Sequence, residues 1–109
     1  MMNFWNTWQD NLKWFDEQTE REIQMAEWSI KRKKVSYFRS IYNDCKNEAE
    51  ASSGEKKISW QKMMGEIVIS IADLKDVSIT DDEKQALEDG NDLEKINEMY
   101  NEIITKPLV

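Results

Sequence analysis

The sequence predicts an all-α helical bundle in which one long N-terminal helix packs with two to three shorter helices. Neither glycine nor proline, the strongest helix breakers, occurs between Met1 and Ser53. Apolar residues recur at spacings of three and four residues, which is typical of amphipathic helices. Capping signals divide the second half into short helices. A chain of 109 residues is the size of one domain, so we expect a single helical domain over residues 1–109.

The first predicted helix covers about residues 3–48, with Asn3 as its N-cap. One apolar stripe follows a single face of this helix and consists of Trp8, Leu12, Phe15, Ile23, Ala26, Ile30, Tyr37 and Ile41. A helix of about 45 residues would be about 65 Å long. The rest of so small a domain is too short to cover that length. The helix therefore either breaks near Ser29–Lys34 or needs cover from another molecule.

A second apolar stripe lies on roughly the opposite face of the same helix. Its members are Trp14, Met25, Trp28, Val35 and Tyr42, with Phe38 between the two stripes. Large aromatic side chains concentrate binding energy at protein interfaces. We therefore predict that the second stripe forms a homodimer or partner interface centred on Trp14 and Trp28. The alternative is that the helix breaks and a four-helix core absorbs both stripes.

A small polar segment, residues 51–57, predicts a turn before a second helix over about residues 59–76. Ser59 is the expected N-cap, and Ile58 and Met63 are spaced as a hydrophobic staple. Residues 66–71 are rich in β-branched side chains and would also suit a strand. We favour a helix because no second strand is available to pair with it.

Two further helices are predicted over about residues 81–89 and 92–105. Thr80 and Glu83 have the spacing of a capping box, and Gly90 suits a left-handed C-cap. Asn91 with Glu94 would begin the last helix, which Pro107 closes.

The composition disfavours most catalytic and metal chemistry. Histidine is absent and Cys45 is the only cysteine. The chain thus lacks the usual general base near neutral pH and the ligands of a multi-cysteine metal site. We expect no enzyme activity, no cofactor and no metal. No apolar run reaches the length of a membrane span and no secretory signal is visible. These features predict a cytoplasmic protein without a membrane partner.

The net charge of −7 is unevenly distributed. Residues 31–57 hold eight bases against four acids, whereas residues 58–109 hold five bases against twelve acids. A candidate basic patch consists of Lys31, Arg32, Lys33 and Lys34, and a candidate acidic surface consists of Asp81, Asp82, Glu88 and Asp89. The acidic excess repels phosphate backbones, so direct nucleic-acid binding is disfavoured.

These observations predict a protein that works by stoichiometric binding. The main hypothesis is a small acidic regulator or inhibitor of another protein, of the kind found among phage and mobile-element accessory proteins. One alternative is an acidic DNA mimic that blocks a DNA-binding protein. Another is a structural or assembly subunit that associates with itself.

Overall fold

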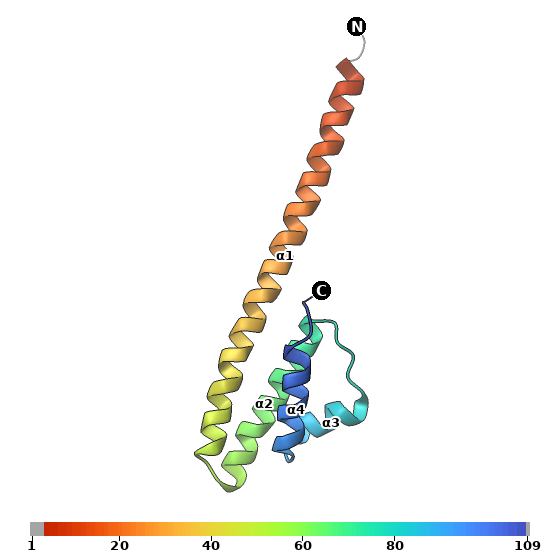
Figure 1. Ribbon diagram of the computed structural model, residues 1–109. Helices are drawn as coiled ribbons and strands as arrows, with labels where there is room; N and C mark the ends of the chain where they lie inside the picture. Colours follow the sequence, from red (N-terminus) through yellow and green to blue (C-terminus); the bar gives the residue numbers. More distant parts are fainter. Residues whose placement is uncertain (1–3, 109) are drawn as a thin grey trace. The chain divides into compact units, whose positions relative to one another are not determined.

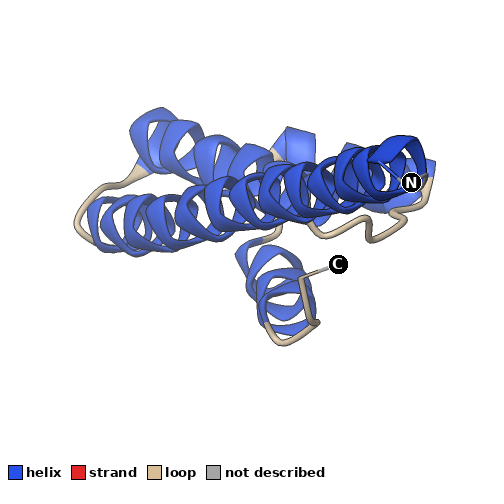
Figure 2. Cartoon of the chain, turned by 90° about the horizontal axis from the view of Figure 1, so that it is seen from above, coloured by secondary structure: helices blue, strands red, loops and turns tan. Residues whose placement is uncertain are grey.

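The computed structural model describes the backbone of residues 4–108 and the side chains of residues 17–108. All regular secondary structure in this part of the chain is helical (Figure 2). The four helices are α1 (Phe4–Glu50), α2 (Gly54–Leu74), α3 (Asp81–Asp89) and α4 (Leu93–Ile104). The predicted all-α class is confirmed. The predicted cap at Asn3 lies outside the described residues.

The chain divides into two compact units, Met1–Ile30 and Lys31–Val109. The boundary falls within α1, whose backbone is helical throughout Phe4–Glu50, so the predicted break near Ser29–Lys34 is not observed. The described part of the first unit contains only the N-terminal turns of α1. The second unit contains the remaining turns of α1 together with α2, α3 and α4.

The core lies in the second unit, where α2 and α4 pack beside the C-terminal turns of α1 (Figure 1). The strand alternative for residues 66–71 is wrong, because they form two turns of α2 and bury Ile67, Val68 and Ile71. The buried apolar residues come from all four helices and are Tyr42, Cys45, Ala49, Met64, Ile67, Val68, Ile71, Ala72, Leu87, Ile96, Met99 and Ile103.

A close approach of two backbones joins α2 to α3. A Cβ atom built on Gly65 would lie 1.9 Å from the carbonyl oxygen of Leu87, so only glycine allows this contact. Gly90 ends α3 with φ at 66°, in the left-handed region, and confirms the predicted C-cap. The capping box of Thr80 and Glu83 is also confirmed.

The starts of α2 and α4 differ from the prediction. α2 begins at Gly54 with Ser53 as N-cap, so the turn is shorter than residues 51–57. Glu55 favours this earlier start because its charge lies near the positive end of the helix dipole. The predicted cap Ser59 instead donates a hydrogen bond to the Glu55 carbonyl oxygen within the helix, at 3.0 Å. α4 is capped by Asp92, whose side chain accepts a hydrogen bond from the backbone of Lys95.

Lys75, directly after α2, is buried and holds the C-terminal end of α4. Its ammonium group donates to the backbone carbonyls of Ile103 at 3.2 Å, Ile104 at 2.9 Å and Lys106 at 2.7 Å. The last carbonyls of a helix have no partner within the helix, so a cation there satisfies them. Burial, with a smaller contribution from the nearby Arg39, lowers the pKa of Lys75.

Candidate protein-binding surface

The five residues predicted to form one interface do not share one surface. Tyr42 is 1% exposed and belongs to the core, and Val35 is half-buried against it. Met25 and Trp28 are 71% and 44% exposed. The side chain of Trp14 lies outside the described residues. Tyr42 therefore lies in the core rather than on an exposed surface, and the candidate surface narrows to Met25 and Trp28.

The seven-residue spacing of Trp28, Val35 and Tyr42 gives the physical reason for this correction. Seven residues make nearly two helical turns, so such positions repeat on one face. In the second unit, this is the face that α1 packs against α2 and α4. Tyr37 of the first stripe is 64% exposed in the same unit. The periodicity of apolar residues predicts both stripes, but it does not predict which stripe the rest of the chain buries.

Tyr42 is fixed by the last helix. Its ring stacks on Tyr100, with the centroids 3.7 Å apart and the planes 3° from parallel. Its hydroxyl donates a hydrogen bond to Oδ1 of Asn97. Burial, followed by the effect of Tyr100, raises the pKa of Tyr42 well above its ordinary value of 10.0. These contacts join α1 to α4 within the second unit.

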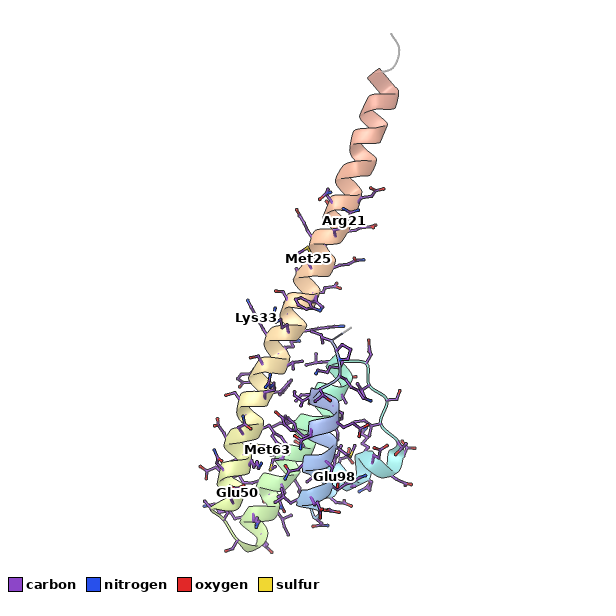
Figure 3. The ribbon with its side chains drawn as sticks, viewed as in Figure 1. Arg21, Met25, Lys33, Glu50, Met63 and Glu98 are labelled. Carbon is purple, nitrogen blue, oxygen red and sulfur yellow. The ribbon has the colours of Figure 1, made fainter. Side chains whose placement is uncertain are left out.

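The Met25 and Trp28 side chains form an exposed apolar surface on α1. Arg21, Gln24, Met25 and Trp28 follow the spacing of three, four and seven residues and line a shallow depression on the helix. Figure 3 shows Arg21 and Met25 projecting from the helix. Ala26 and Ser29 complete the lining, which is mostly apolar and includes the guanidinium of Arg21 and the carboxamide of Gln24. This arrangement suits an apolar side chain of another protein together with hydrogen-bond acceptors beside it.

A second exposed apolar face on α1 was not anticipated. Ile23 and Ile30, both members of the first stripe, are each 53% exposed. Ala26 lies between them and is also exposed. The three- and four-residue spacing of the first stripe predicts that these residues share one face. The spacing does not show whether that face is buried by the same chain or by another molecule.

The candidate acidic surface lies on α3, and its four carboxylates are exposed. Asp81 and Asp82 occupy the first turn of α3, where negative charge complements the helix dipole. Asp89 accepts a hydrogen bond from Nε2 of Gln85 at 2.8 Å. Stabilisation of α3 itself therefore accounts for the acidic residues in its first turn.

The candidate basic patch lies on α1 at the beginning of the second unit. Arg32, Lys33 and Lys34 are exposed, whereas Lys31 is half-buried. Four consecutive residues point around the whole circumference of a helix, so the patch does not form one basic face.

Cys45 is buried, and burial, followed by the charges of Asp44 and Glu48, raises the pKa of its thiol. Over the residues whose placement is described, no three acidic or cysteine side chains are grouped so that they could hold a metal ion. None of the helices in that same part is long and apolar enough to cross a membrane.

Comparison of the chain with protein families, curated proteins and solved structures finds no match in any of the three.

Proposed function

We propose that this protein acts by stoichiometric binding to another protein, as a regulator or inhibitor, through the surface formed by Met25 and Trp28. The observation that carries the proposal is the exposure of these two large side chains on one face of α1. Methionine adapts its shape to a partner, and tryptophan is enriched among residues that dominate binding energy. We further propose that the protein is cytoplasmic and has no catalytic activity. A phage or mobile-element origin is compatible with this function.

The energetic argument is that these side chains gain more from a partner than from water. Complete burial of such an apolar side chain stabilises a complex by about 1.5–3 kcal/mol. Arg21 and Gln24 line the same depression as Met25 and Trp28 and supply hydrogen-bond donors beside them. An apolar centre with a polar rim is the usual anatomy of a protein interface.

Affinity capture with matched variants tests this proposal. A Met25→Ala/Trp28→Ala protein should lose a partner that the unmodified protein retains in a fixed ratio. Met63→Ala is the control, because Met63 is a 45% exposed methionine of α2, in the other compact unit. Retention of every captured protein by the double variant would contradict the proposal. Far-UV circular dichroism should show equal helicity for all three proteins.

An acidic DNA mimic is the alternative proposal, supported by the exposed carboxylates of α3. It predicts that neutralising Asp81, Asp82 and Glu88 abolishes capture of basic DNA-handling proteins, whereas the Met25→Ala/Trp28→Ala change does not. It ranks second because capping and the helix dipole already account for charge in the first turn of α3.

A further inference from the structure

We propose that a depression in the second unit, between α1 and the residues that follow α2 and α4, binds a small oxyanion of the phosphate type through Ser36 and Arg39. This inference goes beyond the proposed function, because it concerns a small ligand and a different compact unit from the protein-binding surface. The depression also differs from the candidate basic patch, of which Arg32 alone is among its lining residues.

One face of α1 forms a wall of this depression. The lining residues are Arg32, Val35, Ser36, Arg39, Lys75 and Leu108. The first four are spaced by three, four and seven residues along α1, so they share one face of the helix. All six belong to the unit Lys31–Val109. The volume is about 260 Å³, below the roughly 300–1,000 Å³ of pockets for drug-sized ligands, so the depression suits a small ligand.

Positive charge gathers around the depression. Arg32, Arg39 and Lys75 line it, and none of the described residues that line it is acidic. Burial, and after it the charge of Arg39, lowers the pKa of Lys75, so these two cations lie close enough to disfavour each other. An anion bound between them would be attracted by both charges and would offset this repulsion.

Ser36 and Arg39 supply the hydrogen bonds to the anion. Both are exposed, and the guanidinium presents a planar fork of N–H donors that matches two oxygens of a phosphate group. The hydroxyls of Ser59 and Ser70 donate to carbonyl oxygens of their own helix, whereas among the described residues Ser36 makes no such bond. Lys75 contributes its charge alone, because its ammonium group already donates to three carbonyl oxygens.

The charge at the depression favours a doubly charged ion over a carboxylate or a nucleic acid. Three cationic side chains line so small a volume, and the attraction grows with the charge of the ligand. A carboxylate carries one charge. A long polyanion would also be repelled by the rest of the chain, whose net charge is −7. A small ion of the phosphate type avoids both disadvantages.

Titration of the full chain with inorganic phosphate at pH 8 and constant ionic strength, followed by amide chemical shifts, tests the proposal. The amides of Ser36, Arg39 and Lys75 should shift along one saturable curve. Arg39→Gln should weaken binding by at least about tenfold, because charge-assisted hydrogen bonds are lost. Lys33→Gln is the matched control, since it removes one charge from an exposed position of α1 that is not among the lining residues. It should change the affinity by less than about twofold, because solvent and salt screen an exposed charge.

A second variant and two further anions complete the test. Ser36→Asp places a carboxylate in the depression, so it should abolish phosphate binding and raise the urea midpoint by attraction to Arg39. Acetate should bind at least about tenfold more weakly than phosphate, because it carries one charge. Tighter binding of glycerol phosphate would identify a phosphate group carried by a small molecule as the ligand, and weaker binding would identify the free ion.

Four outcomes would overturn the proposal. They are amide shifts that do not saturate, equal affinities of the Arg39→Gln and Lys33→Gln proteins, undiminished phosphate binding by Ser36→Asp, and acetate binding as tight as that of phosphate.

Discussion

Trp28 and Tyr42 lie fourteen residues apart on the same helix, yet their surroundings differ completely. Trp28 is 44% exposed, whereas Tyr42 is 1% exposed and stacks on Tyr100. Both are large aromatic residues of the same apolar stripe, and α1 is helical at both positions. The difference arises because α2 and α4 contribute Met64, Ile71 and Ile96 to the core around Tyr42. A stripe of apolar residues thus predicts that a helical face will be buried. The tertiary fold decides how much of that face is buried by other helices of the same chain.

The largest expected effect is in the core and comes from filling the contact between α2 and α3. Gly65→Ala would place a methyl group 1.9 Å from the Leu87 carbonyl oxygen, so the two helices must separate. We expect a loss of at least about 3 kcal/mol in the free energy of unfolding, the upper end for overpacking. Urea unfolding followed by circular dichroism measures this loss. Unchanged stability would show that α3 is not held against α2 in this way.

Truncations in the two regions sharpen the comparison directly. Leu87→Ala, at a fully buried position, should lower the free energy of unfolding by about 2–5 kcal/mol. Ile30→Ala, at an exposed position, should change it by less than about 0.5 kcal/mol. Equal losses for the two variants would show that the first unit has a cover within its own chain. The same urea titrations measure both.

Removing the buried cation should have an intermediate effect. Lys75→Met keeps the length of the side chain but leaves the carbonyls of Ile103, Ile104 and Lys106 without their common donor. We expect a loss of about 2 kcal/mol, as for hydrogen bonds to a charged group. Amide hydrogen exchange should increase most in the last turn of α4. If exchange increases equally in α3, Lys75 stabilises the second unit only in a general way.

Alkaline pH should weaken the second unit through Tyr42. Its pKa in the folded protein is raised, so between the unfolded value of about 10 and the folded value the unfolded chain binds fewer protons. The stability supplied by this phenol is complete below pH 10 and is lost as the pH rises above it. The loss should be on the order of 1 kcal/mol at pH 11. Urea titrations at pH 8 and pH 11 measure it, and Tyr42→Phe should show a correspondingly smaller pH dependence.

Thiol reactivity gives the smallest perturbation and distinguishes the two regions. Cys45 is 2% exposed and its pKa is raised, so it should react slowly with an aromatic disulfide reagent at pH 8. A cysteine placed at Met25 should react rapidly, because that position is 71% exposed. A Met25→Cys protein should therefore show one fast and one slow thiol, and urea should make both fast. Two slow thiols would place Met25 within a covered surface.

Much of the fold follows from local sequence signals. The capping box at Thr80, the left-handed Gly90 and the helical spacing of α1 and α2 act over a few residues, so local physical chemistry predicts them. The start of α2 was placed too late because Ser53 and Ser59 are both acceptable caps by type. Glu55, close to the positive end of the helix dipole, favours the earlier start.

The candidate site was predicted less well, because exposure depends on contacts between distant segments. Met25 and Tyr42 belong to the same stripe, and only the positions of α2 and α4 separate an exposed residue from a buried one. The burial of Lys75 had no signal in the sequence. Its partners are backbone carbonyls 28 to 31 residues further along the chain, and a carbonyl group carries no residue identity.

The hold of Lys75 on residues 103–106 has a practical consequence for handling and for turnover of the protein. Proteolytic cleavage that removes Lys106 would remove the acceptor of the shortest of the three hydrogen bonds, at 2.7 Å. The end of α4 would then be held less firmly. Because Met99 and Ile103 of that helix lie in the core, clipping a few residues there would expose apolar surface that degradation machinery recognises. Affinity tags and fluorescent labels are therefore better separated from this end by a flexible spacer.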